Sequence, residues 1–560
     1  MTALDVDPPE TGTEKTGAQL LVAELLQQGV DTIFCVPGES YLWFLDALYE
    51  VQDRIRLVSC RHESAASFMA NAYGKLTGRV GVCAVSRGPG ITNASIGIHV
   101  AQQDSTPVVV IVGQIPRVMR GRDAFQEMDI AHAYRDIAKD AIDVATAAQL
   151  PEVTRRAFSQ AQSGRPGPVL IVIPEDVFSE KADVPLIPPA ERLHLRPAAS
   201  DMDELQGLLA AAERPLILAG GPGWSNEAAG TLGAYSVRNE LPAATAFRYQ
   251  DAVDNEIQTY AGDVGIGINP RLAARIRQAD LLLAIGTRFD DIVSGAYQSP
   301  DLPTARQTLV HVHPSPADLQ RYYQPRLSIL SDATEFVRAL AMLPPLQPRW
   351  RQWADEARSD YLAWRTPASN GPRLDLAVVM RQLRETLPAD AIVASGAGNY
   401  TTWVHRYFSF RQFRTQLAPI AGTMGYGVPA AVAAGIIRPE RQVVCVAGDG
   451  CFMMSSQELA TARQTPNVVF MVVNNGMYGT IRLHQERHFP GRVMGTSLTN
   501  PDFVAFAQAF GLYAETVTAT DEFLPAFRRA TSADRAALLE LQTDPAQLTP
   551  TVRLDAKTAS

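Results

Sequence analysis

Two short polar motifs follow apolar runs in the last part of the sequence. Gly448-Asp449-Gly450 follows RQVVCVA, and Asn474-Asn475-Gly476 follows NVVFMVV. If the two runs are neighbouring parallel strands, their carboxyl ends lie about 5 Å apart, so Asp449 and Asn475 face one point. A carboxylate, an amide oxygen and a backbone carbonyl are hard oxygen ligands that suit Mg²⁺ bound to phosphate. Alone, Gly-Asp-Gly indicates only a turn, but the two motifs together predict a metal site.

The two motifs resemble the signature of thiamine-diphosphate enzymes. In that family the Asp, the second Asn and a carbonyl two residues later bind Mg²⁺, and the matching residues here are Asp449, Asn475 and Met477. The stretch 395–400 also follows an apolar run and opens a helical pattern, so its backbone N–H groups are expected to receive the diphosphate. The resemblance implies further cofactor contacts at Gly396, Ala397, Gly398, Asn399, Gly448, Gly450 and, through its backbone N–H, Cys451.

Glu63 is the candidate acid that activates such a cofactor. It follows the strand-like run RLVSC and opens a helix of small residues, which predicts a buried junction between strand and helix. Desolvation there is expected to raise the pKa of the carboxyl and to suit it to proton exchange. An acid at this place also stabilises a helix N-terminus, and the residues alone agree with both interpretations. In the family that the chain resembles, the matching glutamate is the activating acid.

Further stretches resemble one group within this family, the acetolactate (acetohydroxyacid) synthases, over essentially the whole chain. They are the stretches 36–39, 88–93, 124–127 with Lys139, and 422–425. The resemblance implies that Gly88, Phe125, Gln126 and Lys139 line the donor side. It also implies cofactor contacts at Pro37, Gly38, Glu39, Asn93, Gly422 and Met424. A bulky apolar side chain such as Met424, wedged between the two cofactor rings, would force the bent conformation that brings the reacting atoms together.

Two departures from the group concern the second substrate. The arginine that reads the acceptor in the group falls on Ile292, and its pocket tryptophan falls on His484. The cation that would hold a second carboxylate is therefore missing from its usual place. Several other basic residues are candidates for this role, although each is equally interpretable as a solvated surface charge: Arg87, Arg248, His405, Arg482 and Arg487.

The middle of the chain resembles the domain that binds FAD in the same group. Gly220-Gly221 and the stretch 286–291 follow apolar runs, as a nucleotide site requires. A Gly-Gly pair after a strand is equally typical of α/β domains in general. The sequence therefore leaves open whether FAD binds.

Short apolar runs alternate with helical periodicities along the chain, which predicts an α/β fold of three doubly wound parallel-sheet domains. A length of 560 residues agrees with this number, at ~100–200 residues per domain. Proline-rich stretches near 185–200 and 342–372 are the expected linkers. The predicted parts are a disordered leader (1–16), a pyrimidine-binding domain with the activating acid (17–185), a central domain with a FAD-type fold (200–342) and a diphosphate- and Mg²⁺-binding domain (372–550).

The composition is that of an ordinary globular protein, with 46% hydrophobic residues, 19% charged residues and a net charge of −9. No run of like charges could follow a nucleic-acid backbone, and no apolar run reaches the ~20 residues of a membrane span. The five cysteines form no C-x-x-C pair, and the N-terminus resembles neither a signal nor a transit peptide. We therefore expect a cytoplasmic protein whose partners are small molecules rather than nucleic acid or membrane.

The resemblance implies decarboxylation of a 2-oxo acid, pyruvate, and carboligation to a second carbonyl compound, in branched-chain amino acid biosynthesis. It also implies a homodimer or homotetramer, because Glu63 of one subunit meets the Gly-Asp-Gly block of another in that group; a regulatory subunit is not indicated either way. The loss of arginine at Ile292 allows an alternative, cleavage or ligation of 2-hydroxyacyl compounds or other acyloins. A silent paralogue that binds the cofactor is a third hypothesis, and the joint presence of Glu63, Asp449 and Asn475 argues against it.

Overall fold

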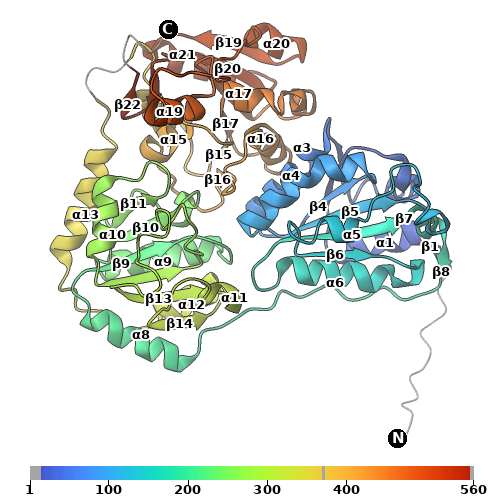
Figure 1. The fold of residues 1–560 in the computed structure, drawn as a ribbon, viewed down its shortest axis with the longest axis horizontal. Helices are drawn as coiled ribbons and strands as arrows, with labels where there is room; N and C mark the ends of the chain where they lie inside the picture. Colours follow the sequence, from blue (N-terminus) through green and yellow to red (C-terminus); the bar gives the residue numbers. More distant parts are fainter. Residues whose placement is uncertain (1–13, 369–371, 555–560) are drawn as a thin grey trace, which may run out of the picture. The chain divides into compact units, whose positions relative to one another are not determined.

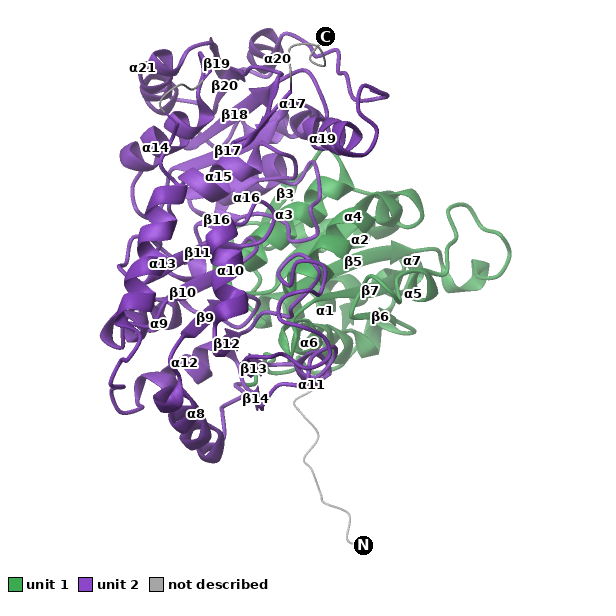
Figure 2. Ribbon diagram, turned by 60° about the vertical axis from the view of Figure 1, so that its left-hand side comes forward, with its two compact units in different colours: residues 1–193 green, residues 194–560 purple. Residues whose placement is uncertain are grey.

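The apolar runs of the sequence form the strands of three six-stranded parallel sheets (Figure 1). The computed structural model describes residues 14–368 and 372–554. These form two compact units, one up to Leu193 with a single six-stranded sheet and one from His194 onward with the other two (Figure 2). The α/β class with three parallel sheets is confirmed.

The sheet of the first unit has the strand order β3-β2-β4-β5-β7-β6, and all its neighbours are parallel. Its strands are β2 (Thr32–Cys35), β3 (Arg56–Ser59), β4 (Gly81–Val85), β5 (Val108–Gln114), β6 (Asp140–Asp143) and β7 (Pro168–Pro174). Its helices are α1 (Gly17–Gln27), α2 (Leu42–Tyr49), α3 (Glu63–Thr77), α4 (Pro89–Asp104), α5 (Ile130–Ala133), α6 (Leu150–Gln162) and α7 (Glu175–Ser179). Every residue of β4, β5 and β7 is buried, because helices cover both faces of the sheet.

The end of the predicted leader is ordered. Most of the leader lies outside the described residues, but β1 (Lys15–Thr16) pairs antiparallel with β8 (Lys181–Ala182). The Thr16 side chain then caps α1 in a capping box with Gln19. The leader prediction is therefore wrong for these two residues, because a strand pair and a helix cap hold them.

The central sheet of the second unit has the order β11-β10-β9-β12-β13-β14. Its strands are β9 (Pro215–Ala219), β10 (Ala243–Ala246), β11 (Tyr260–Val264), β12 (Leu281–Ile285), β13 (Thr308–His313) and β14 (Leu327–Leu330). Its helices are α8 (Ala199–Ala211), α9 (Asn226–Arg238), α10 (Pro270–Gln278), α11 (Pro316–Leu319), α12 (Ala333–Ala341) and α13 (Arg351–Trp364). Alternate residues of β9 and β12 enter different apolar clusters, so the continuous apolar runs bury both faces. Helix α13 packs against β11, so part of the predicted linker 342–372 is structured.

The last sheet has the order β16-β15-β17-β18-β20-β19, again with parallel neighbours. Its strands are β15 (Ile392–Ser395), β16 (Gln416–Leu417), β17 (Val443–Gly448), β18 (Val468–Asn474), β19 (Tyr513–Val517) and β20 (Ala537–Gln542). Its helices are α14 (Leu376–Thr386), α15 (Thr401–Tyr407), α16 (Gly427–Ile437), α17 (Asp449–Met453), α18 (Leu459–Ala462), α19 (Gly479–His488), α20 (Phe503–Ala509) and α21 (Thr520–Thr531). A small antiparallel pair, β21 (Gln547–Thr549) and β22 (Val552–Arg553), follows the sheet.

Buried polar groups join the central and last sheets of the second unit. The Asp251 carboxylate accepts the backbone N–H groups of Thr415 (3.0 Å) and Gln416 (3.1 Å). The Gln250 backbone N–H donates to the Gln416 side chain (2.9 Å), which donates back to Gln250 Oε1 (3.0 Å). Because these groups are desolvated, their mutual hydrogen bonds fix how the segment before β16 meets the central sheet.

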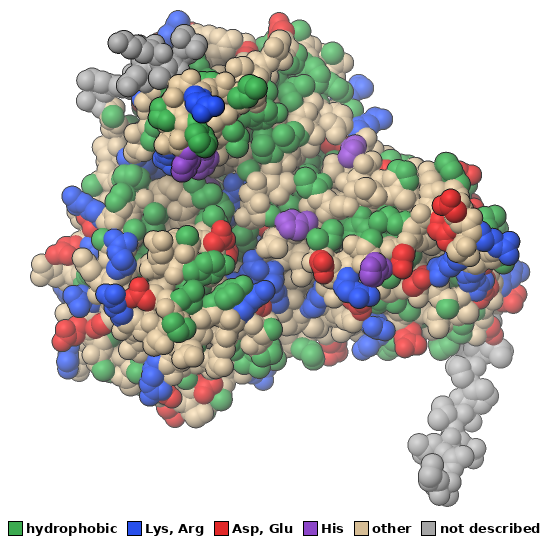
Figure 3. All heavy atoms as spheres, in the orientation of Figure 1, with side chains coloured by type: hydrophobic (Ala, Val, Ile, Leu, Met, Phe, Trp, Pro, Cys, Tyr) green, Lys and Arg blue, Asp and Glu red, His purple; other side chains and the backbone are tan. Residues whose placement is uncertain are grey.

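The surface shows no stripe of one charge on the face drawn in Figure 3, where basic and acidic side chains are interspersed. No helix among the described residues is long and apolar enough to cross a membrane.

Candidate functional site

The two polar motifs meet at the carboxyl edge of the last sheet, as their spacing predicts. Strands β17 and β18 are parallel neighbours, and Gly448 pairs with Val473 in their register. Asp449 and Asn475 follow these strand ends. A hydrogen bond from the backbone N–H of Gly476 to Asp449 Oδ2 (2.9 Å) joins the two motifs directly.

Asp449 is a buried carboxylate with a fixed orientation. Its residue is 2% exposed, Oδ1 accepts the Gly450 N–H (2.9 Å), and Oδ2 also accepts the amide of Asn500 (2.8 Å). Burial raises the pKa of Asp449 above its ordinary value, and the hydrogen bonds that it accepts oppose this shift. A cation at this carboxylate would favour its charged form and offset the desolvation.

The predicted metal ligands differ from one another in chemistry. Among the described residues, no three His, Cys, Asp or Glu side chains gather into a metal cluster. The predicted set combines the Asp449 carboxylate with the Asn475 amide oxygen and the Met477 carbonyl. Asn475 Oδ1 accepts the Met477 N–H (3.2 Å), and the Met477 carbonyl accepts the N–H of Gly479 (3.0 Å). Each of these oxygens has a second lone pair, so the donor set fits Mg²⁺.

A cavity of about 360 Å³ opens beside these residues, a volume that suits a small cofactor. The predicted cofactor and metal residues that line it are Ala397, Gly398, Asn399, Gly422, Met424, Gly448, Asp449, Gly450, Cys451, Asn475 and Met477. Gly396 lies behind the wall instead, where an added Cβ would come within 2.4 Å of Cys451 Sγ. Cys451 Sγ accepts the Gly425 N–H (3.2 Å), so this thiol is a packed part of the wall.

Two features of the cavity wall fit a diphosphate. Asn399 Oδ1 accepts the Thr480 hydroxyl (2.9 Å), which turns the amide so that Nδ2 is buried without an acceptor among the described residues. Gly422 has φ +63°, and an added Cβ there would meet no atom within 4 Å. An N–H donor without an acceptor and a backbone segment with free space beside it are both suited to binding phosphate oxygens.

Two polar residues fix this site from outside the predicted ligand set: Asn500, which lies in no sequence motif, and Tyr400, which ends the predicted stretch 395–400. Asn500 donates to Asp449 Oδ2 and to Asn474 Oδ1 (3.0 Å), so it ties the two strand ends together from a distant loop. The Tyr400 hydroxyl accepts the Gly396 N–H (3.1 Å) and donates to Cys451 Sγ (3.3 Å). Asn500 precedes a proline, which indicates a turn and nothing more.

The carboxyl edge of the first unit's sheet brings together a second group of predicted residues. Glu63 begins α3, and its Oε2 accepts the amide of Asn93 from α4 (3.0 Å). An added Cβ at Gly90 would lie 3.6 Å from Glu63 Oε1, and one at Gly38 would lie 2.7 Å from Ser86. The loops after β2 and β4 therefore meet beside Glu63, whose side chain is half-buried rather than enclosed.

Of the residues predicted to line the donor side, Gly88 and Gln126 lie together in the region of this edge. Gly88 has φ +56°, and an added Cβ there would lie 2.9 Å from Gln126 Cβ, so these two residues are in contact. The Phe125 side chain is 76% exposed. The Glu127 carboxylate accepts the N–H groups of Gly121 (2.6 Å) and Ala124 (2.9 Å), which holds this loop in shape.

Lys139 does not join them. It precedes β6, so it lies at the amino edge of a parallel sheet, whereas Glu63 and Gly88 follow strand ends at the opposite edge. Its ammonium donates to the carbonyls of Ser163 (2.6 Å) and Arg165 (2.9 Å). Desolvation and the nearby Arg165 guanidinium lower the pKa of Lys139 to about 8. The structure corrects the expected placement, because spacing along the chain does not reveal at which end of a strand a residue lies.

Of the five basic residues considered for a substrate carboxylate, two are paired within the chain, one is neutral and one is exposed to solvent. Arg248 donates to the Pro419 carbonyl (2.6 Å), and Arg482 pairs with Glu486 (2.8 Å). Burial and the Arg248 charge lower the pKa of His405 to about 3, so this imidazole is neutral near pH 7. Arg487 is exposed on α19. Arg87, in the loop after β4, is buried.

The glycines of the central sheet are required by its own packing. The chain changes direction between β9 and β12, where an open α/β sheet binds its ligands. An added Cβ at Gly221 would come within 1.8 Å of the Gly286 carbonyl oxygen, so the two loops approach backbone to backbone. The buried Trp224 indole donates to the Gly220 carbonyl (2.9 Å). Ile292 packs against the apolar core.

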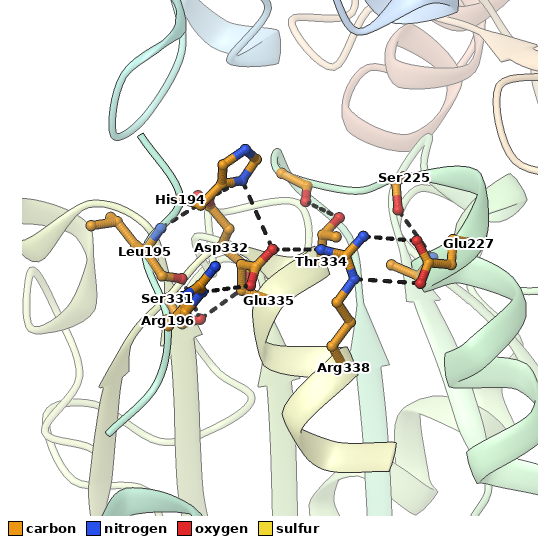
Figure 4. Close-up of polar contacts among 12 residues, drawn as sticks. His194, Leu195, Arg196, Ser225, Glu227, Ser331, Asp332, Thr334, Glu335 and Arg338 are labelled. Atoms are coloured by element: carbon orange, nitrogen blue, oxygen red, sulfur yellow. Dashed lines mark hydrogen bonds and ion pairs between the residues drawn. The ribbon is translucent and has the colours of Figure 1, made fainter. Parts of the chain in front are cut away.

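The chain's own segment 194–196 binds beside β14 (Figure 4). The Leu195 N–H donates to the Asp332 carboxylate (3.2 Å), and the Ser331 hydroxyl donates to the Leu195 carbonyl (2.8 Å). Arg196 pairs with Glu335 at 3.2 Å (Figure 4). These polar groups and glycines have partners or packing roles within the chain itself, so FAD stays a prediction of the resemblance.

Known proteins match the chain in both regions that carry these sheet edges. Three family models match the chain: the thiamine pyrophosphate enzyme N-terminal TPP binding domain (residues 15–133), central domain (202–340) and C-terminal TPP binding domain (396–541). The acetolactate synthase isozyme 2 large subunit of Escherichia coli K12 is 33% identical over 533 residues, covering 94% of this chain and 95% of that protein. The acetolactate synthase large subunit of Parasynechococcus marenigrum is 34% identical, covering 92% and 85%. The probable acetolactate synthase large subunit of Methanocaldococcus jannaschii is 30% identical, covering 96% and 93%.

Proposed function

Because the chain belongs to the acetolactate synthase family of thiamine-diphosphate enzymes, we propose that it decarboxylates pyruvate and joins the two-carbon fragment to a second carbonyl compound. The observation that carries this proposal is the meeting of Asp449 and Asn475 at neighbouring strand ends beside a cavity. Thiamine diphosphate, when bound, supplies the electron sink that lets a 2-oxo acid lose CO₂.

The residues of the last sheet hold the cofactor in this proposal. Asp449, Asn475 and the Met477 carbonyl bind Mg²⁺, and the unfilled Asn399 amide donates to a diphosphate oxygen. Met424 lines the cavity and supports the rings by apolar contact.

Glu63 would exchange a proton with the pyrimidine ring nitrogen of the bound cofactor, and Asn93 would orient the Glu63 carboxyl group. The bond from the Asn93 amide to Oε2 occupies one carboxyl oxygen and leaves Oε1 for the proton. Glu63 and the cavity belong to different compact units, and we propose that they meet between subunits of a homodimer or homotetramer. We also propose that the enzyme works in the reducing cytoplasm, which the five free, buried cysteines support.

The test is the purified chain with saturating thiamine diphosphate, Mg²⁺ and pyruvate alone. We expect acetolactate, measured by its conversion to acetoin in acid, and none from Asp449→Ala. No acetolactate from the parent protein would refute the proposal. Cleavage of a 2-hydroxyacyl compound by that same preparation would then favour the lyase alternative.

A further inference from the structure

We propose that Arg87 binds the carboxylate of a 2-oxo acid substrate and thereby selects acids over uncharged carbonyl compounds. The inference rests on the proposed function, because it assigns a substrate contact at the edge that carries Glu63. Arg87 lies two residues after the end of β4 and precedes Gly88, the residue in contact with Gln126. Its carbonyl accepts the N–H of Gly90 (3.3 Å), the glycine that faces Glu63.

The Arg87 guanidinium is buried with donors to spare. The residue is 8% exposed, and its Nε has no acceptor among the described residues. The contact of its Nη1 with Glu175 Oε2 is 3.5 Å long, whereas charge-assisted hydrogen bonds of this kind measure about 2.7–2.9 Å. Arginine carries five N–H donors in a planar fork. A buried cation held by one long contact is unfavourable unless another anion fills the fork, and a carboxylate matches it in shape.

Glu175 is the counterion in the absence of substrate. It begins α7 after β7, at the same carboxyl edge, and its side chain is 36% exposed against 10% for Arg87. The acid can therefore turn toward solvent while the guanidinium stays in place. A substrate carboxylate that displaces Glu175 can accept two parallel hydrogen bonds from the Arg87 guanidinium.

The test compares two probes that differ only in charge, lactate and lactamide, with the enzyme loaded with thiamine diphosphate and Mg²⁺. Lactate keeps the carboxylate of pyruvate but lacks the reactive carbonyl, so binding is measured without turnover by ligand-observed NMR. We expect the parent to bind lactate more tightly than lactamide. Arg87→Gln should weaken lactate binding about 10–100-fold, which corresponds to one hydrogen-bonded charge, and leave lactamide unchanged.

Two further variants keep the inference testable if Arg87→Gln does not fold. Arg87→Lys keeps the charge without the fork and should retain part of the preference for lactate. Glu175→Gln removes the competing carboxylate and should tighten lactate binding. Equal binding of lactate and lactamide by the parent, unchanged lactate binding in Arg87→Gln, or weaker lactate binding in Glu175→Gln would each overturn the inference.

The outcome is separable from that of the proposed function. Acetolactate formation by the parent, with no loss of lactate binding in Arg87→Gln, would refute the role of Arg87 alone. A charge preference that depends on Arg87, in a protein that forms no acetolactate, would refute the proposed reaction alone. If both stand, Arg87→Gln should raise the KM for pyruvate far more than it lowers kcat.

Discussion

Replacement of Asn500 by alanine should weaken Mg²⁺ binding without altering any predicted ligand. The Asn500 amide donates to Asp449 Oδ2 and to Asn474 Oδ1, so it fixes the carboxylate between the two strand ends. Without it, the Gly476 N–H is the one donor that Oδ2 keeps among the described residues, and the carboxylate gains freedom to rotate.

The expected size of the effect follows from this single charged hydrogen bond. Such bonds contribute about 1.5–3 kcal/mol, and each 1.36 kcal/mol is about tenfold in affinity, so we expect a loss of about 10–100-fold. This is the range typical of residues that orient metal ligands. Asn500 is thus a positioning residue, because it acts through Asp449.

The assay titrates Mg²⁺ into metal-free protein at a fixed, saturating concentration of thiamine diphosphate, followed by circular dichroism and by tryptophan fluorescence. Asn467→Ala is a matched control: its amide donates to the carbonyls of Arg438 (3.1 Å) and Arg441 (2.8 Å), at the amino end of β18. The control should lower stability but keep the Mg²⁺ affinity of the parent. An unchanged midpoint in Asn500→Ala, or an equal shift in Asn467→Ala, would refute the reasoning.

Three more outcomes are expected. Glu63→Gln should lower turnover about 10²–10⁴-fold, the usual contribution of a proton-transfer group, while cofactor binding persists; parent-like turnover would exclude the activating role. Burial raises the pKa of Asp263 to about 7, so the folded state keeps a proton that the unfolded state releases, and stability falls as pH rises from about 4 to 7. Asp263→Asn should therefore raise the thermal midpoint more at pH 8 than at pH 5, and an equal rise at both would contradict this. Gly221→Ala should lower the thermal midpoint by several degrees, because its Cβ would meet the Gly286 carbonyl oxygen at 1.8 Å. Gly230→Ala is the control, because its Cβ would meet nothing within 4 Å, and it should leave the midpoint unchanged. Similar midpoints in the two variants would show that the loops carrying Gly221 and Gly286 move apart freely.

The strands and the meeting of the two motifs were predictable because each depends on local pattern. Continuous apolar runs bounded by glycine mark strands that are buried on both faces, and strand ends in a parallel sheet share an edge. The runs before Asp449 and Asn475 satisfy both conditions, and they became the neighbours β17 and β18.

The parts that could not be predicted depend on contacts between distant segments. Asn500 reaches Asp449 from a loop whose sequence indicates only a turn, and Lys139 resembles a site residue in spacing yet lies at the wrong end of its strand. Helix α13 was hidden in a proline-rich stretch, since its stability comes from packing on β11 rather than from a strong pattern. In each case the deciding interaction is tertiary.

The hydrogen bonds between Asp251 and the segment before β16 have a consequence for solubility. Strand β16 is two residues long and forms one border of the sheet that carries the predicted metal site. An open border offers unpaired N–H groups on which a strand of another molecule can add, and such growth leads to aggregation. Here Asp251 takes up the N–H groups of Thr415 and Gln416, and the Gln250–Gln416 pair covers the strand beside them. The central domain therefore covers the edge strand of the last sheet and protects it from pairing with another molecule. This structural role does not depend on whether the central domain binds a nucleotide.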